Sequence, residues 1–128
     1  MHGLQQKLHK SCFRCDKSTC HVESSHILQP PKFLIIIVNR FKYINNRVIK
    51  DKGPIPMDYT LTLGPYTFNL VATVDHHGPT TNSGHYTTYI NCCTKTFFCN
   101  DNKIMEVNLP DGRGSSTAYM LLYRLILE

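Results

Sequence analysis

Apolar runs and alternating apolar and polar positions divide the chain into a series of predicted β-strands. Residues 33–41 carry a continuous Ile-rich run, which is typical of a strand covered on both faces, so we expect a central strand there. From residue 66 to residue 75 apolar and polar side chains alternate, which predicts a half-buried strand whose polar face carries Thr73 and Asp75. Further strands are expected over residues 85–90, 96–99 and 118–127, and from about residue 103.

Turn-forming residues separate these strands. Asn45 and Asn46 lie in the middle of residues 42–50, and asparagine tolerates positive φ angles, so the segment predicts a β-hairpin. Only the first ten residues and the stretch before Pro110 leave room for a helical turn. The sequence therefore predicts an α+β fold that is predominantly antiparallel β, in one domain of 128 residues.

Composition places the chain among folded proteins. Hydrophobic residues make up 41% and charged residues 18%, and no low-complexity tract is present, which argues against intrinsic disorder. The longest apolar run, residues 33–38, is too short to span a bilayer, and the N-terminus lacks the order of a signal peptide. We therefore expect no membrane association and a cytoplasmic or nuclear location.

The net charge of +5 has its densest cluster in the predicted hairpin region. We interpret this cluster as a solvated hairpin face, because scattered lysine and arginine side chains usually lie at the surface. Binding to nucleic acid remains an alternative, although interleaved aromatic residues or a known binding motif would be expected for it. The cluster consists of Arg40, Lys42, Arg47, Lys50 and Lys52.

Cys12 and Cys15 form a Cys-x-x-Cys pair, a spacing that allows two thiolates to bind one structural zinc ion. Cys20 and His21 are candidates for the remaining two ligands, although they follow Cys15 after a short loop. A pair of unligated cysteines is the alternative. The sequence thus predicts a zinc site of which at least half is visible.

The six cysteines could instead form three disulfides, as in a small secreted protein. Reduced thiols are the better interpretation, because no secretion signal is seen and the chain is long enough for a hydrophobic core. The three remaining cysteines show no ligand spacing, and we expect half-buried thiols that act as small apolar side chains, namely Cys92, Cys93 and Cys99.

His85 follows Gly84 at the start of a predicted strand, at the edge of an open loop. A histidine in this setting suits a general base, because the glycine lets another group approach the backbone beside it. Such a base needs a residue that fixes its tautomer, and Asn100 and Asp101 lie near the end of a neighbouring predicted strand. His85 with either residue would make two-thirds of a cysteine-protease triad.

Six segments in this order resemble the C-terminal half of the ubiquitin-specific protease family: CFRC, QPPKFLIIIVNRF, YTFNLVATVDHHG, SGHYTTYI, NDNKIMEV and AYMLLYRL. The resemblance covers residues 12–124 and implies the palm and finger parts of a papain-like cysteine protease fold. It implies a single unit over residues 1–128, with a finger-like region at about residues 8–28. Residues 29–128 would form the palm-like sheet that carries the histidine motif.

The resemblance also implies roles for individual residues. His85 would activate a cysteine thiol, Asn100 would orient its ring, and Asp101 would be the acidic residue that commonly follows. Cys12 and Cys15 resemble the second half of the family's structural zinc site. Residues 75–84 are similar to the loop that borders the channel for ubiquitin's C-terminal glycines, which implies substrate-binding roles for His76, Gly78, Gly84 and Tyr86.

Three features of the family pattern are missing from these residues: the segment that carries the nucleophilic cysteine, the first zinc knuckle, and a tryptophan before the triad asparagine. The resemblance therefore implies part of a deubiquitinase that is inactive alone and becomes a hydrolase when a cysteine-bearing half completes it. Its partners would be ubiquitin or ubiquitinated proteins and that missing N-terminal half. A catalytically inactive ubiquitin-binding module is the alternative.

Overall fold

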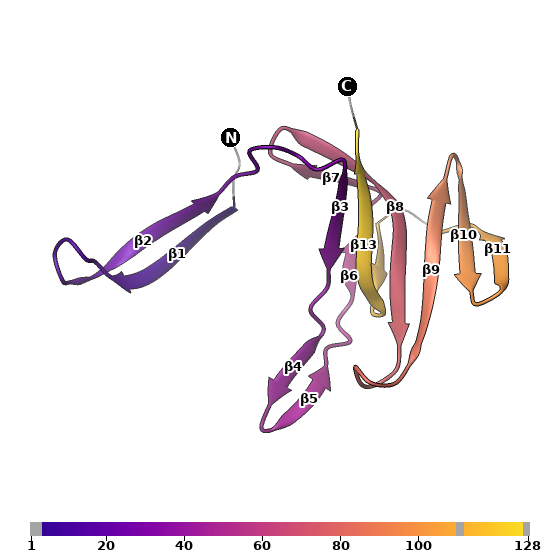
Figure 1. The fold of residues 1–128 in the computed structure, drawn as a ribbon, viewed down its shortest axis with the longest axis horizontal. Coiled ribbons are helices and arrows are strands. Elements are labelled where there is room, and N and C mark those ends of the chain that lie inside the picture. The colour runs from indigo at the N-terminus through magenta and orange to yellow at the C-terminus, as the bar shows by residue number, and fades with distance from the viewer. Residues whose placement is uncertain (1–3, 110–111, 127–128) are drawn as a thin grey trace.

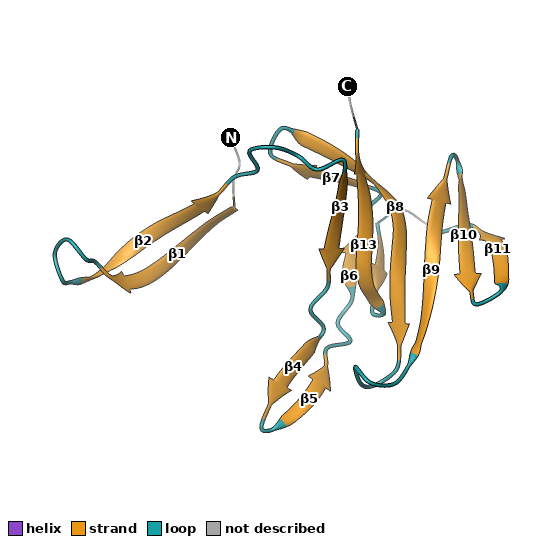
Figure 2. Cartoon of the chain, viewed as in Figure 1, coloured by secondary structure: helices purple, strands orange, loops and turns teal. Residues whose placement is uncertain are grey.

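The computed structural model describes residues 4–109 and 112–126, and one antiparallel sheet dominates it (Figure 1). The strands of this sheet lie in the order β11-β10-β9-β8-β13-β3, and β7 pairs with β8 outside this path. Within the described residues the chain consists of strands and loops without a helix (Figure 2). The predicted antiparallel β fold is confirmed, whereas the helical part of the α+β prediction is not found in these residues.

The strands of the main sheet are β3 (Phe33–Ile37), β7 (Thr60–Leu63), β8 (Tyr66–His77), β9 (His85–Cys92), β10 (Lys95–Asn100), β11 (Lys103–Val107) and β13 (Ala118–Leu125). The smaller pairs are β1 (Leu4–Ser11) with β2 (Ser18–Ser25), β4 (Phe41–Ile44) with β5 (Arg47–Lys50), and β6 (Ile55–Met57) with β12 (Arg113–Ser115).

The first strands form a hairpin that extends away from the main sheet (Figure 1). β1 pairs with β2 along its whole length, from Leu4 opposite Ser25 to Ser11 opposite Ser18. The prediction of a helical turn in the first ten residues is therefore wrong over residues 4–10, whose backbone is paired in a strand, and residues 1–3 lie outside the described residues. The stretch before Pro110 holds β11 and no helical turn, and Pro110 itself lies outside the described residues.

The hydrophobic core is centred on β13, which lies between β8 and β3. The buried side chains of the core come from several strands and pack against β13, which is paired on both edges. The strand predicted over residues 118–127 is found as β13, and three of its side chains are buried in this core. The core residues are Met57, Phe68, Leu70, Ala118, Leu121 and Tyr123.

The apolar segment that was expected to form a central strand is instead an edge strand. β3 ends at Ile37 and, among the described strands, pairs on one side only, with β13. Leu34 and Ile36 pack against the core, whereas the side chains on the opposite face are exposed, with Ile35 at 58% and Ile37 at 62%. The prediction was wrong because an unbroken apolar run reports affinity for burial, but not which neighbour covers each face.

The alternation predicted for residues 66–75 holds in the first part of β8 and then changes. Phe68 and Leu70 are buried, but farther along the strand the buried residues are Thr73 and Asp75. The pairing between β8 and β13 is irregular between these two parts. Because one extra residue turns the following side chains to the opposite face, the prediction that the two polar residues face solvent is wrong.

The hairpin predicted for residues 42–50 is confirmed as β4 and β5, with Asn45 and Asn46 at φ angles of 49° and 59°. The asparagines adopt the left-handed conformation that a two-residue turn requires at both central positions. The hairpin is joined to β3 by residues that include Arg40, whose guanidinium group is buried.

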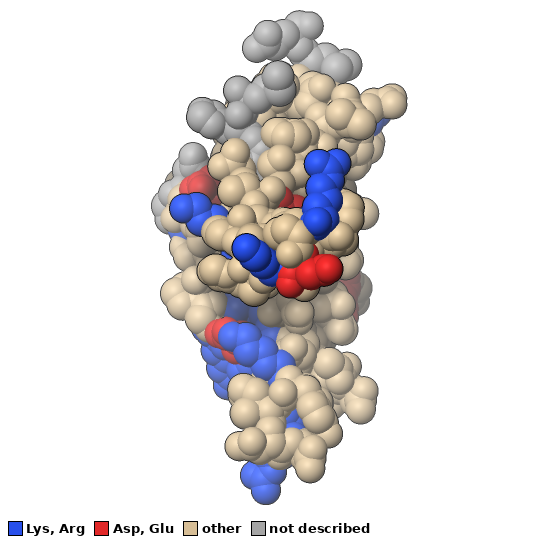
Figure 3. Space-filling view, turned by 90° about the vertical axis from the view of Figure 1, so that its left-hand side faces the viewer, with Lys and Arg blue, Asp and Glu red and all other residues tan. Residues whose placement is uncertain are grey.

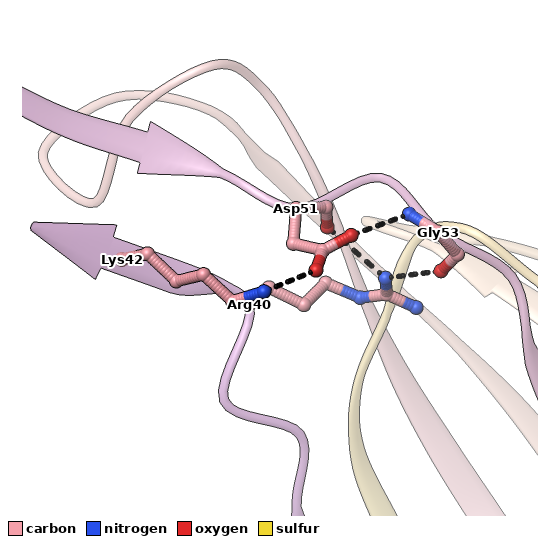
Figure 4. A network of polar contacts seen from close by, with 4 residues as sticks. All are labelled: Arg40, Lys42, Asp51 and Gly53. Atoms are coloured by element: carbon pink, nitrogen blue, oxygen red, sulfur yellow. Dashed lines mark hydrogen bonds and ion pairs between the residues drawn. The ribbon is translucent and has the colours of Figure 1, made fainter. Parts of the chain in front are cut away.

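Arg40 is only 3% exposed, and its guanidinium group donates hydrogen bonds to four backbone carbonyl groups. Nη1 contacts Asp51 O at 3.1 Å and Gly53 O at 2.8 Å (Figure 4). Nε contacts Ala118 O at 2.6 Å, and Nη2 contacts Ser115 O at 2.8 Å. One side chain therefore ties the segment after β5 to the start of β13.

We predict that Arg40→Met lowers the free energy of unfolding by about 3 kcal/mol or more, because several buried carbonyl groups lose their donor together. Urea unfolding followed by circular dichroism measures the change. Arg47→Met, which alters an exposed arginine of the same hairpin, is the matched control and should change stability by no more than about 0.5 kcal/mol. Equal unfolding midpoints for the two variants would contradict the role assigned to Arg40.

Candidate functional site

His85 is the first residue of β9 and lies opposite His77, the last residue of β8. The preceding residue, Gly84, has a φ angle of 151°, and a Cβ atom there would lie 2.4 Å from His76 Nε2 and 2.6 Å from His77 O. Only glycine fits this position. The space beside the Gly84 backbone, which the sequence suggested could admit another group, is taken by the chain's own histidine.

The ring of His85 contacts the side chain of Asn100, the last residue of β10, with Nε2 2.6 Å from Oδ1. The contact forms because β9 and β10 are antiparallel neighbours, which brings the start of one strand beside the end of the other. The predicted juxtaposition of these two side chains is confirmed, and their catalytic roles remain predictions.

Asp101 lies in the turn directly after β10, with a φ angle of 51°, and its side chain is exposed. In the ranges that the structure covers, the Asp101 carboxylate makes no hydrogen bond or ion pair with the His85 ring. The geometry therefore assigns the direct contact to Asn100 and leaves Asp101 nearby on the surface.

His76 is 2% exposed, and polar contacts hold both its ring and its backbone carbonyl. Nδ1 lies 3.0 Å from Lys50 Nζ, which also donates to the carbonyl oxygens of His76 at 2.7 Å and Gly78 at 3.0 Å. Burial lowers the pKa of His76 below its ordinary value of 6.5, and the positive charge of Lys50 lowers it further. A hydrogen bond with the backbone of Ser83 offsets only part of this effect, so the ring is neutral at pH 7.

The loop between β8 and β9 has a narrow neck at its two glycines. A Cβ atom on Gly78 would lie 2.7 Å from Ser83 O and 2.8 Å from Gly84 Cα. Lys50 closes one side of this neck through its bonds to the strand end. Of the residues predicted to bind substrate, His76, Gly78 and Gly84 thus form the base of the loop.

Tyr86, the fourth residue predicted to bind substrate, differs from the other three because its side chain is an exposed aromatic ring beside the loop. Its side chain is 52% exposed, and its ring centroid lies 4.9 Å from that of His76. The Tyr119 ring follows at 6.1 Å, so the aromatic residues line up beside the loop. The substrate-binding roles stay predictions.

Two residues of this region were missed by the sequence analysis as parts of the site: Lys50 and Asp75. Asp75 is 1% exposed and accepts hydrogen bonds from Thr117 Oγ1 at 2.7 Å, Thr73 Oγ1 at 3.1 Å and Ser115 Oγ at 3.3 Å. The backbone N–H of His76 donates to the carbonyl of Thr117, so this network supports the strand end below the loop. Thr73 lies on the same strand as Asp75, whereas Ser115 and Thr117 come from a distant segment that no sequence spacing links to Asp75.

Cys12 and Cys15 lie in the turn between β1 and β2. The pKa of the Cys12 thiol is lowered mainly by a hydrogen bond from the backbone of Arg14, and then by bonds from the side chain and backbone of Cys15. Thiolates stabilised in this way are suitable metal ligands. Over residues 4–109 and 112–126, however, no third cysteine, histidine or carboxylate completes a metal-binding group with them.

The other two suggested ligands lie farther along β2. Cys20 is exposed, and the His21 ring contacts Thr19 Oγ1 at 2.9 Å through Nε2. The described residues therefore supply two thiols and fit half of a tetrahedral zinc site. Zinc binding remains a prediction that requires ligands from elsewhere.

The remaining cysteines lie on the β9–β10 hairpin of the main sheet. Cys99 is half-buried, as expected. Cys92 and Cys93 are exposed, so the expectation of half-buried thiols is wrong for them. They lie at the free end of the β9–β10 hairpin, where the short turn leaves their side chains largely open to solvent.

The basic cluster of the hairpin region is not a continuous charged surface. Arg40 is buried, Lys50 contacts His76, and Lys42 pairs with Asp51 at 2.8 Å. On the face shown in Figure 3, lysine and arginine side chains lie scattered among uncharged residues, with acidic side chains beside several of them. This arrangement gives no support to nucleic-acid binding.

The described part of the chain contains no helix long and apolar enough to cross a membrane.

A family model described as ubiquitin carboxyl-terminal hydrolase matches residues 2–123, and the chain therefore belongs to this family of ubiquitin-specific proteases. The mouse (Mus musculus) ubiquitin carboxyl-terminal hydrolase 17-like protein E is 27% identical over 124 residues, covering 88% of this chain and 22% of the mouse protein. Ubiquitin carboxyl-terminal hydrolase 10 of Saccharomyces cerevisiae is 26% identical over 121 residues, covering 88% of this chain and 15% of that protein. The chain thus spans about a fifth of the length of such relatives.

Solved structures of the yeast SAGA DUB module share the fold. One such structure matches with a TM-score of 0.79 at 20% identity, covering 98% of this chain and 31% of that chain. The SAGA Ubp8/Sgf11/Sus1/Sgf73 DUB module bound to ubiquitin aldehyde matches with a TM-score of 0.73 at 18% identity, covering 98% of this chain and 32% of that chain. These similarities confirm the architecture of the sheet, and the family resemblance drawn from the six segments is confirmed by the family match.

We predict that His76 titrates below its ordinary pKa of 6.5, because burial and Lys50 disfavour the charged ring. Since the pKa is lowered in the folded state, neutral His76 supports folding above about pH 6.5, and this contribution is lost as the pH falls through the folded value. NMR titration of the imidazole signals measures the pKa. In Lys50→Met the His76 signal should shift toward a higher pKa. A pKa at or above 6.5 for His76 in the unsubstituted protein would contradict the assignment.

Proposed function

We propose that this chain is the part of a deubiquitinating cysteine protease that supplies the general base, His85, and the residue that orients it, Asn100. The observation that carries the proposal is the 2.6 Å contact between His85 Nε2 and Asn100 Oδ1. Membership in the ubiquitin carboxyl-terminal hydrolase family supports the reaction class. The structure bound to ubiquitin aldehyde, with the same fold, supports ubiquitin as the substrate class.

The proposed chemistry begins with the tautomer of His85. Asn100 Oδ1 is an acceptor, so Nε2 carries the proton of the neutral ring and Nδ1 presents a lone pair. Nδ1 would take the proton of a cysteine thiol, and the thiolate would attack the carbonyl carbon of ubiquitin's terminal glycine. The imidazolium would then protonate the leaving amine, and water would hydrolyse the thioester.

The nucleophile would come from outside this chain. Six cysteines are present, all within the described residues, and none of them hydrogen-bonds the His85 ring. A neutral asparagine fixes the ring without adding charge, so it stabilises the imidazolium less than a carboxylate does. Asp101 lies next in the chain and would contribute at longer range.

We propose that Tyr86 contacts the ubiquitin tail through its exposed ring, while His76, Gly78 and Gly84 act by shaping the loop. The exposed fraction of Tyr86 is 52%, against 2% for His76. A tail of glycines needs a narrow channel beside the loop, and the two neck glycines allow the backbone segments to approach closely.

The alternative is a catalytically inactive module that binds ubiquitin. It would keep the exposed loop and Tyr86 but perform no hydrolysis, since the chain alone lacks a nucleophile near His85. Measurement of ubiquitin affinity separately from hydrolysis distinguishes the two functions: in the module, His85→Ala leaves ubiquitin affinity unchanged and no completed protein shows turnover.

We predict that the 128-residue chain does not hydrolyse a fluorogenic ubiquitin amide, because the attacking thiolate is missing. In the protein completed by its cysteine-bearing half, His85→Ala should lower kcat/KM by about a thousandfold or more. Asn100→Ala should act in the same direction with a smaller effect, and exposed His26→Ala should leave kcat/KM unchanged. Turnover by the isolated chain, abolished by His85→Ala, would show that it carries its own nucleophile.

We propose that Cys12 and Cys15 bind zinc when two further ligands are supplied, and that the isolated chain binds it weakly. Elemental analysis of the completed protein should find one zinc ion per chain, lost in Cys12→Ser. Cys99→Ser is the matched control, since Cys99 lies on β10, outside the turn that carries the two thiols. Stoichiometric zinc that survives Cys12→Ser would contradict the site.

A further inference from the structure

Two consecutive exposed cysteines lie at the free end of the hairpin that carries both His85 and Asn100. Cys92 is the last residue of β9, and Cys93 is the first residue of the two-residue turn to β10. Their sulfur atoms are 4.0 Å apart, within hydrogen-bonding range for sulfur. Neither thiol has a role in the proposed hydrolysis.

The turn holds Cys93 in a backbone conformation that is unfavourable for its residue type. Cys93 has a φ angle of 57°, in the left-handed region that favours glycine. A non-glycine residue in this region costs about 1 kcal/mol or more, and such outliers concentrate at functional sites. The turn also sets the register of β9 against β10, in which Cys92 lies opposite Lys95.

The two thiols are chemically different. The pKa of Cys92 is raised, first by its hydrogen bond with Cys93 and then by the charge that Cys93 carries as a thiolate. The 4.0 Å contact therefore places a second thiol, Cys92, directly beside the Cys93 sulfur.

Cys93 also lines a cavity of about 310 Å³ that is large enough for a small polar oxidant. Lys95 and Arg113 line the same cavity. The Lys95 ammonium group is paired with Glu106 at 2.9 Å, so Arg113 is the residue whose positive charge favours a thiolate here. The Arg113 guanidinium lies 4.7 Å from the centre of the Tyr89 ring, which holds this cation in place. The cavity is separate from the loop beside His85.

We propose that Cys92 and Cys93 form a peroxide-reactive dithiol, with Cys93 as the attacking sulfur and Cys92 as the resolving thiol. The Cys93 thiolate attacks one oxygen of hydrogen peroxide, the O–O bond breaks, and the products are a Cys93 sulfenic acid and, after protonation, water. Cys92 then attacks the Cys93 sulfur, a second water leaves, and a disulfide forms. Two thiols are oxidised, and one peroxide is reduced to two waters.

The disulfide formed in this way is readily reversed. Consecutive Cα atoms are about 3.8 Å apart, shorter than the 4.4 Å at which ordinary disulfide spacings begin, so closing the ring strains the turn. A thiol reductant reopens it. The oxidation changes the turn that sets the β9–β10 register, and it does not depend on the proposed hydrolase function.

The test is chemical and uses the 128-residue chain. After treatment with hydrogen peroxide and blocking of free thiols, cleavage after lysine and arginine places Cys92 and Cys93 together in residues 53–95 and Cys99 in residues 96–103. Residues 53–95 should lose two hydrogen atoms in mass, at a rate about tenfold or more above the oxidation of Cys99. Reduction should restore the original mass.

Two variants test the order of the steps. In Cys92→Ser the Cys93 sulfenic acid cannot be resolved, so dimedone should label it, whereas Cys93→Ser should remove the rapid reaction. Cys99→Ser, on the same hairpin, is the matched control and should leave the reaction unchanged. A pair that stays reduced while Cys99 oxidises, or equal dimedone labelling in both single variants, would overturn the proposal.

Discussion

A buried arginine that binds only backbone carbonyl groups organises this protein. Arg40 brings the segment after β5 and the start of β13 onto one guanidinium group. Because burial of a cation is costly without partners, the carbonyl groups and the guanidinium group must be ordered together. The start of β13 is thereby fixed, and with it the hydroxyl groups of Ser115 and Thr117 that surround Asp75.

The candidate site depends on this support through a chain of short contacts. Asp75 precedes His76, and the buried ring of His76 lies between Lys50 and the Gly84 backbone. Gly84 in turn fixes the start of β9, where His85 begins the strand. The β4–β5 hairpin therefore serves the site from a distance, since its last residue, Lys50, ties the neck of the loop. An exposed histidine can be positioned accurately when the loop before it is held by buried polar contacts.

Much of the strand arrangement was predicted from the sequence. Alternation and turn residues gave the antiparallel strands and the asparagine turn of β4 and β5. The order of the motifs correctly predicted that His85 and Asn100 lie side by side. A strand, a short turn and a second strand leave few alternatives for their pairing. Errors arose where pairing partners decided burial: β3 is an edge strand, and Thr73 is buried after an irregularity in β8.

The sequence by itself determined the strand-rich architecture, the family, the hairpin turn and the identity of the histidine and asparagine at the candidate site. Local patterns carry this information, since backbone propensity and side-chain alternation act over a few residues. Only the tertiary structure decided that Lys50 contacts His76 and that Arg40 is buried, and it also exposed the Cys92–Cys93 pair. These contacts join segments far apart in the chain, and the burial that determines their energies exists only after the sheet has formed.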